Sequence, residues 1–109
     1  MKRAKAPRPA ARKAAAPPTL DKLLHTPVRL GIVSILRKGP LSFPKLRVAL
    51  ATTDGNLSVH ARKLEAAGYV ACEKAFAGRV PRTRYRVTPK GRRALARYLE
   101  DMERILGGS

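Results

Sequence analysis

Apolar residues recur at intervals of three and four positions in four segments of the chain, which is the spacing of helices with one buried side. The first predicted helix begins at Thr26 and Pro27, an N-cap followed by a residue suited to the first turn, and it ends before Gly39. A second helix of about two turns begins near Ser42, and a third begins after Thr53. A short helix, a tight connection and a longer helix predict a helix-turn-helix.

The third predicted helix has a buried side and an exposed side. Leu57, Ala61 and Leu64 recur with the helical period and define the buried direction. The residues that point away from this direction, or flank the outward face, form the predicted recognition surface: Asn56, Ser58, Val59, Arg62 and Lys63. A DNA major groove is wide enough to admit such a helix.

The residue types on this surface suit the chemistry of base edges and phosphates. Arg62 can donate two hydrogen bonds to guanine, Asn56 can pair with adenine, and Val59 can touch a thymine methyl group. Ser58 and Lys63 suit contact with phosphate. The alternative is a polar face that is only solvated, and the basic hairpin that follows favours groove contact.

After Gly68 the pattern changes to the alternation typical of strands, with residues 77–82 as the tip of a hairpin. In the second strand Tyr85 and Val87 can pack inward, while the residues that alternate with them are cationic. The tip and the second strand carry four arginines and no acid: Arg79, Arg82, Arg84 and Arg86. In a helix-turn-helix protein such a hairpin is a wing.

The final predicted helix begins at Thr88 and Pro89 and carries a continuous apolar stripe. The stripe consists of Leu95, Tyr98, Leu99, Met102, Ile105 and Leu106. These side chains exceed what so small a body needs to cover, so we expect some of them to meet another subunit. The elements together predict a mostly helical α+β fold, a winged helix-turn-helix with a two-stranded β-hairpin wing and a long C-terminal helix.

The 109-residue chain has the length of one domain and carries 24 Lys and Arg against 7 Asp and Glu, a formal net charge of +17. This excess predicts an anionic partner, and nucleic acid is the commonest one.

We expect a disordered basic arm rich in Ala and Pro at residues 1–18, the winged-helix domain at 19–106, and a flexible C-terminus at 107–109. The basic residues of the arm are predicted to make non-specific phosphate contacts: Lys2, Arg3, Lys5, Arg8, Arg12 and Lys13. The alternative is a solvated tail that only aids solubility.

Other classes of function find little support in the sequence. The single cysteine, Cys72, excludes an internal disulfide and favours a reducing compartment, and no apolar run approaches the ~18 residues of a membrane span. We therefore expect a cytoplasmic, nucleoid-associated protein without membrane contact.

His25, His60 and Cys72 do not form a zinc-ligand pattern, and we find no catalytic signature or phosphate loop. We expect no metal, no cofactor and no enzymatic activity, with packing or capping as the role of His60 and a buried strand position as that of Cys72.

The chain resembles small winged-helix transcriptional regulators related to the MarR and ArsR repressors in two stretches, HTPVRLGIVSILRKGPLSFPKLRVAL and TDGNLSVHARKLEAAGYVACEKAFAGRVPRTRYRVTPKGRRAL. The resemblance covers residues 19–106 and depends on the combination of NLSVHARKLEAAGYV, PRTRY and VTPKGRRAL. The cysteine-rich motif of ArsR-type metal sensors is absent, and the small size leaves little room for an effector pocket.

This resemblance implies a homodimer whose third helices occupy successive major grooves and whose wings contact the flanking minor grooves through Arg79, Arg82 and Arg84. It also implies dimerisation through the first and last helices. That arrangement adds three residues to the apolar stripe as interface residues: Leu20, Leu23 and Leu24.

The predicted function is sequence-specific binding of double-stranded DNA by a homodimeric transcriptional regulator. A non-specific architectural or nucleoid-associated protein is the main alternative, and the basic tail is the best argument for it. A winged helix that contacts RNA or protein is a third interpretation, because the fold alone does not determine the ligand. The sequence identifies no small-molecule effector.

Overall fold

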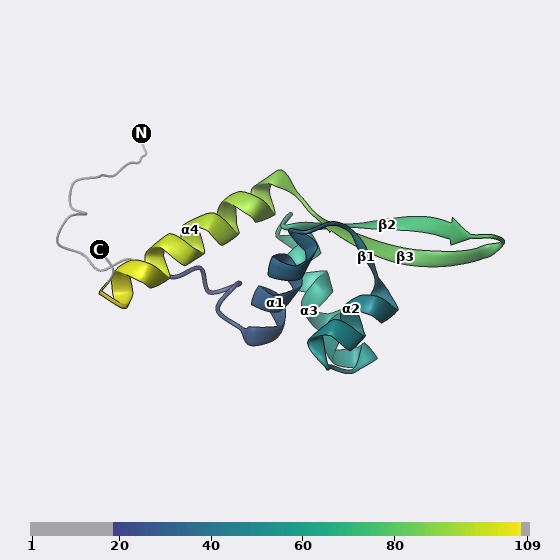
Figure 1. Cartoon of the computed structure of the whole chain (residues 1–109), viewed down its shortest axis with the longest axis horizontal. Coiled ribbons are helices and arrows are strands. Elements are labelled where there is room, and N and C mark those ends of the chain that lie inside the picture. Colours follow the sequence, from purple (N-terminus) through teal and green to yellow (C-terminus); the bar gives the residue numbers. More distant parts are fainter. Residues whose placement is uncertain (1–18, 108–109) are drawn as a thin grey trace, which may run out of the picture.

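The computed structural model describes residues 19–107 of the chain, except for the side chains of Ala75 and Ala77. This part of the chain contains α1 (Pro27–Leu36), β1 (Leu41–Ser42), α2 (Phe43–Leu50), α3 (Asp54–Ala66), β2 (Val70–Ala77), β3 (Val80–Val87) and α4 (Pro89–Ile105) (Figure 1). The predicted fold class, a mostly helical winged helix with a hairpin wing and a long last helix, is confirmed. None of the helices between residues 19 and 107 has the length and apolar content needed to span a membrane. The predicted arm at residues 1–18, and residues 108–109 of the predicted C-terminus, lie outside the described residues.

Three of the four predicted helix caps are confirmed. The side chains of Ser42, Thr53 and Thr88 each accept a hydrogen bond from the backbone N–H three residues later, at 3.4, 3.1 and 3.0 Å. Thr26 occupies the N-cap position of α1 but makes no such bond. Its hydroxyl oxygen instead accepts a hydrogen bond from the Arg29 guanidinium at 2.8 Å.

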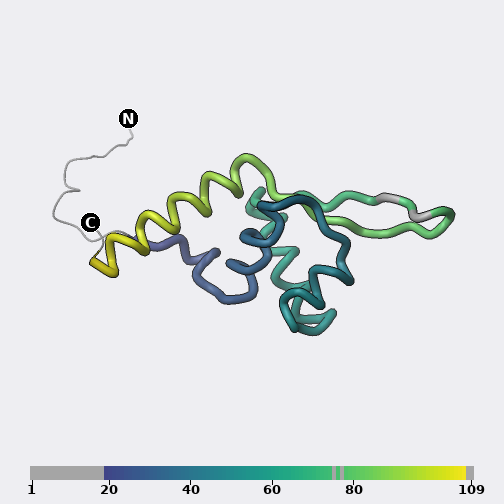
Figure 2. The backbone as a smooth tube through the Cα atoms, viewed as in Figure 1, coloured from purple at the N-terminus to yellow at the C-terminus, as the bar shows by residue number. Residues whose placement is uncertain are grey.

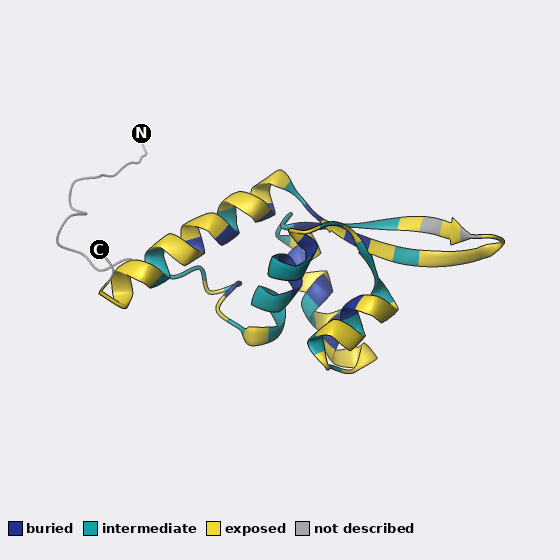
Figure 3. Ribbon diagram, in the orientation of Figure 1, coloured by how far each residue is buried: buried dark blue, intermediate teal, exposed yellow. Residues whose placement is uncertain are grey.

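The helices pack around α1, which contacts α2, α3 and α4. The segment before α1 forms a turn, in which the Leu24 and His25 N–H groups donate to the carbonyl of Asp21 at 3.2 and 3.0 Å. The buried core consists of Leu24, Ile32, Val33, Leu36, Leu46, Leu57, Ala61, Leu64, Val70, Tyr85, Val87, Leu95 and Tyr98. Figure 3 shows these positions on the inner sides of the elements, whereas most of the wing and the outer side of α4 are exposed.

The sheet has three antiparallel strands in the order β1-β3-β2, so the predicted two-stranded wing is extended by one short strand. In β1, Leu41 pairs with Tyr85 and Ser42 with Arg84. A strand of two residues is too short to show an alternating pattern, which is why the sequence did not predict it.

The wing hairpin closes with a two-residue turn, Gly78 and Arg79, between the paired residues Ala77 and Val80. Gly78 has a φ of 67°, and a glycine with positive φ at this first position is the requirement of a type II′ turn. Figure 2 shows the hairpin projecting well beyond the helices, with the C-terminal part of α4 running toward the opposite end of the molecule.

The start of α4 is held tightly against the end of α3 and the start of β2. The Thr88 hydroxyl donates to the carbonyl of Gly68 at 2.6 Å. A Cβ atom on Gly91 would lie 2.1 Å from the carbonyl oxygen of Tyr69, so only glycine permits this approach. The Tyr69 hydroxyl donates to Asp21 at 2.5 Å, and burial together with this hydrogen bond raises the pKa of Tyr69 to about 12. These contacts fix the base of the wing relative to α3.

Candidate nucleic-acid interface

The two sides of α3 differ as the sequence predicted. The inner side chains of Leu57, Ala61 and Leu64 are fully buried. On the outer side Val59 is 49% exposed, and the other exposed or half-buried members of the predicted recognition surface are Asn56, Ser58, Arg62 and Lys63. The outward orientation is therefore confirmed, and contact with bases remains a prediction.

The N-terminal end of α3 is positioned by the tight connection from α2. Ala51 adopts a left-handed conformation with a φ of 52°, and the Thr52 N–H donates to the carbonyl of Arg47 at 3.2 Å. The Arg47 side chain continues across the turn and forms an ion pair with Asp54 at 2.9 Å. Asp54 also lies in the first turn of α3, where a negative charge is stabilised by the helix dipole.

The polar side chains on the outer face of α3 are oriented by local hydrogen bonds. The Asn56 side-chain amide donates to the Thr52 hydroxyl at 2.7 Å, and the Arg62 guanidinium donates to the Ser58 hydroxyl at 3.4 Å. Each bond uses one N–H of the donor side chain. Asn56 keeps a carbonyl oxygen and a second N–H, and Arg62 keeps further N–H groups, so both retain the capacity for paired hydrogen bonds to a base.

His60 lies at the edge of this face and connects α3 to α1. Its Nδ1 accepts a hydrogen bond from the Arg29 guanidinium at 2.9 Å, and Arg29 also donates to the carbonyl of Leu23 at 2.5 Å. Burial lowers the pKa of His60, and the positive charges of Arg29 and Lys63 lower it further. The predicted packing role of His60 agrees with these contacts.

No group of three metal-ligating side chains occurs within residues 19–107. Cys72 occupies a strand position on β2, as predicted, opposite Tyr85, and its side chain is partly buried against the core.

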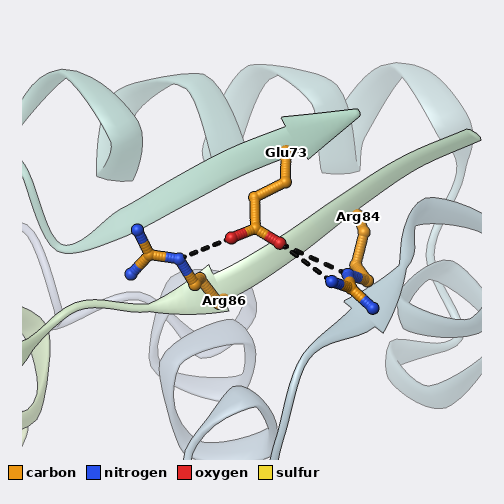
Figure 4. A network of polar contacts seen from close by, with 3 residues as sticks. All are labelled: Glu73, Arg84 and Arg86. Atoms are coloured by element: carbon orange, nitrogen blue, oxygen red, sulfur yellow. Dashed lines mark hydrogen bonds and ion pairs between the residues drawn. The ribbon is translucent and has the colours of Figure 1, made fainter. Parts of the chain in front are cut away.

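The arginines of the wing fall into two groups. Near its base, the Glu73 carboxylate lies between Arg84, at 3.1 Å, and Arg86, at 2.7 Å (Figure 4). Hydrogen bonds from Arg86 and Arg84 lower the pKa of Glu73, so this residue stays negatively charged. Further out, Arg79 in the turn and Arg82 on β3 are exposed and form no ion pair with any residue that the structure describes. The tip is thus the two-residue turn, shorter than the predicted residues 77–82, because both strands extend into that range.

Glu73 is the residue of this surface that sequence reasoning missed. It belongs to the first strand of the hairpin, whereas the four arginines that predict a basic wing lie in the tip and the second strand. The pairing register places Glu73 directly opposite Arg84. A two-residue hairpin turn at Gly78 and Arg79 predicts the same pair from the sequence. The predicted DNA contact of Arg84 therefore has a competing partner within the protein.

A groove of about 490 Å³ lies between the wing on one side and α2 with Ser58 of α3 on the other. Its walls are formed by Ser58 of α3, Phe43 and Pro44 of α2, and residues 80–83 and Tyr85 of β3. The groove joins the outer face of α3 to the exposed part of the wing. One residue of each predicted contact surface, Ser58 of α3 and Arg82 of the wing, therefore lines the same depression.

The predicted dimer-interface residues divide into three groups. Leu24, Leu95 and Tyr98 are 0%, 2% and 3% exposed, so they belong to the core of the protomer and are removed from the predicted interface. Leu20, Leu23 and Met102 are partly buried against that core. Leu99, Ile105 and Leu106 form the third group, and their side chains are 47%, 49% and 77% exposed, respectively.

A helix-turn-helix with a basic outer face, a hairpin wing beside it and a groove between them define the winged-helix class of DNA-binding domain. Residues 28–106 match the family described as winged helix DNA-binding domain, and the chain belongs to this family. This is a family of DNA-binding domains and not of enzymes, as predicted.

Two archaeal proteins are similar to the chain over most of their length. The uncharacterized protein MJ0432 of Methanocaldococcus jannaschii is 36% identical over 83 residues, which cover 74% of this chain and 89% of that protein. The structure of a transcriptional regulator homologue from Pyrococcus horikoshii has a TM-score of 0.73 and 36% identity, covering 79% of this chain and 86% of the other.

A more distant similarity concerns the fold alone. Bacillus subtilis PadR, solved in complex with operator DNA, has a TM-score of 0.60 and 20% identity, and the match covers 66% of this chain and 46% of PadR. The kinship with winged-helix regulators that the sequence predicted is confirmed, and regulators of the PadR type are among the structural neighbours.

Proposed function

We propose that the protein is a homodimeric transcriptional regulator that binds specific sequences of double-stranded DNA. In this proposal the outer face of α3 enters the major groove and the wing contacts the adjacent minor groove. The observation that carries the proposal is the exposed row of Asn56, Val59 and Arg62 above a fully buried row of apolar residues. Such a helix presents hydrogen-bonding and apolar groups to the edges of the bases, and the buried side of the helix holds them in place.

The similar regulators support this assignment. The Pyrococcus horikoshii structure, at 36% identity, is that of a transcriptional regulator homologue, and PadR was solved with its operator DNA. Arg79 and Arg82 in the outer part of the wing supply positive charge where a wing reaches the sugar-phosphate backbone. The excess positive charge of the whole chain agrees with an anionic partner.

Selection of bound fragments from a random duplex pool tests the proposal. We expect an enriched, two-fold symmetric motif with half-sites about one helical turn apart, because each protomer presents one recognition helix. The enriched duplex should bind at least ~10³-fold more tightly than random duplex at the same salt concentration. A ratio near one would instead favour the architectural alternative, and comparable affinity for structured RNA would favour the third interpretation.

The dimer is proposed to form through the last turns of α4. Leu99, Ile105 and Leu106 are large apolar residues that the described part of the protomer leaves exposed. Exposed apolar groups gathered on one helix end are typical of a subunit contact. Leu20, Leu23 and Met102 lie partly buried nearby in the apolar cluster and are proposed to border this contact.

Sedimentation of an α4 variant tests this interface. Leu99→Asp should give a monomer, whereas the control Val48→Asp, at a residue 67% exposed on α2, should leave the dimer intact. A Leu99→Asp protein that remains a dimer would place the contact elsewhere. A wild-type monomer would refute the homodimer.

A further inference from the structure

The outer part of the wing exposes large apolar side chains that have no role in the core. Phe76 is 72% exposed and Val80 is 55% exposed. Phe76 pairs with Pro81 across the hairpin, so the two side chains share one face of the wing near its end. Burial of a phenylalanine side chain stabilises a protein by about 1.5 to 3 kcal/mol, and the exposed Phe76 does not contribute this stabilisation. The stability of the fold therefore does not explain why a phenylalanine stands at this position.

Positive charges lie near these apolar residues on both faces of the wing. Lys74 is exposed on the same face as Phe76, Arg79 lies in the turn, and Arg82, which pairs with Ala75, is on the opposite face together with Val80. No acidic residue occurs between Lys74 and Arg82. An apolar side chain on a hairpin that carries cations on both of its faces complements a nucleic-acid groove, where phosphates line the rims and base pairs stack in the interior.

We propose that the wing bends DNA by inserting Phe76 between base pairs of the minor groove, with Pro81 supporting the ring and Arg79 and Arg82 holding the adjacent phosphates. The inference rests on the proposed function, since it assumes that α3 occupies the neighbouring major groove. It adds a further activity to sequence recognition, namely deformation of the bound duplex. Apolar wedges of this kind unstack a base step and bend the duplex toward the major groove.

The arrangement of the groove and the wing agrees with this step. Tyr85 is buried at the base of the wing, and Pro81 lies four residues further out, which is about 13 Å at the rise of a strand. The groove between Ser58 and the wing includes Pro81 in its wall. If one sugar-phosphate strand of the duplex lies in this protein groove, the DNA major groove on one side of that strand faces α3. The DNA minor groove on its other side then faces Phe76.

Energy transfer between dyes on the two ends of the enriched duplex tests the proposal. Saturating wild-type protein should shorten the end-to-end distance, because the duplex bends. Phe76→Ala should lose most of this change, whereas Phe76→Leu should keep it, since leucine also serves as a wedge. Arg79→Ala is the matched control from the same wing, and it should lower affinity but leave the bend at saturation unchanged.

The outcomes separate the wedge from the proposed function. A wild-type protein that binds the duplex without shortening it, or a Phe76→Ala variant that bends it equally, would refute the wedge alone. Failure of the wild type to bind any duplex would refute both. A change of oligomeric state in Phe76→Ala without DNA would assign Phe76 to a protein contact and overturn the proposal. The melting temperature of Phe76→Ala should match that of the wild type, because the side chain is exposed.

Discussion

The recognition helix α3 and the wing both present cations to the solvent, but they are supported in different ways. One whole side of α3 is buried, with Leu57, Ala61 and Leu64 at 0% exposure. Among the wing side chains that the structure describes, the buried ones lie at the base, Val70, Tyr85 and Val87, and the outer part is held by strand pairing (Figure 3). The core therefore determines where the side chains of α3 lie, whereas the end of the wing is held by its own hairpin.

Under the proposed function, this difference suits the two surfaces to different tasks. Hydrogen bonds to base edges require donors and acceptors at defined positions, and a helix anchored in the core provides them. Contact with phosphates tolerates a less rigid support, because it is electrostatic and independent of sequence. We therefore expect substitutions in α3 to change stability and specificity, and substitutions in the wing to change overall affinity.

The largest expected effect is the loss of a buried side chain of α3. Leu57→Ala should lower the free energy of unfolding by about 2 to 5 kcal/mol, because it leaves a cavity in the core. The matched wing substitution, Val80→Ala, should change it by less than about 0.5 kcal/mol, since Val80 is 55% exposed. Urea denaturation of both variants measures the difference, and equal losses would show that the wing is packed as firmly as α3.

A smaller effect is expected for the exposed arginines of the two regions. Arg62→Ala should weaken binding to the enriched duplex by about 1 to 3 kcal/mol and relax the preference at one base position. Arg82→Ala should weaken binding about equally for all duplexes and reduce the slope of log affinity against log salt concentration by about one. Binding titrations over a set of duplexes and salt concentrations distinguish the two. Identical specificity profiles would remove the recognition role from Arg62.

A modest gain of affinity is expected when the acid at the base of the wing is neutralised. Glu73→Gln should release Arg84 and Arg86 from their ion pairs and make both available to phosphate. Affinity for random and enriched duplex should rise together, and the dependence on salt should become steeper. The control Glu103→Gln removes the same charge from the exposed side of α4. If the two variants bind alike, net charge rather than the wing explains the gain.

The smallest effect concerns His60, at the edge of α3. Its pKa lies below the ordinary value of 6.5 in the folded protein, so the unfolded chain takes up a proton at higher pH than the folded one. This residue should therefore reduce stability as the pH falls through about 6.5 toward the lowered pKa, with no further change below it. His60→Gln should show a smaller fall in melting temperature between about pH 7.5 and about pH 5.5. An unchanged fall would mean that other groups account for it.

The sequence predicted the elements that depend on local chemistry. Helical periodicity identified α3 and its outward face, and Ser42, Thr53 and Thr88 cap their helices as expected. The exception, Thr26, is explained by a contact with the Arg29 side chain that no local rule describes.

The features that the sequence missed depend on residues brought together by the fold. The strand β1 has two residues and exists because β3 lies beside it. Leu95 and Tyr98 belong to an apolar stripe that does not reveal which surface covers it, and Leu24 is an interface residue only by the resemblance, whereas all three lie in the core of the protomer. In the structure Tyr98 contacts His25, 73 positions earlier in the chain, through a hydrogen bond of 2.8 Å. Such pairs become visible only when the packing is known.

In the proposed complex, the outer face of α3 reads bases from the major groove. The most direct test replaces each purine of the enriched duplex in turn by its 7-deaza analogue, which lacks the N7 acceptor used by arginine and asparagine. We expect single replacements to weaken wild-type binding, with a guanine effect that disappears in Arg62→Ala and an adenine effect that disappears in Asn56→Ala. If no replacement weakens the wild-type complex, α3 does not read purines from that groove and the claim is contradicted.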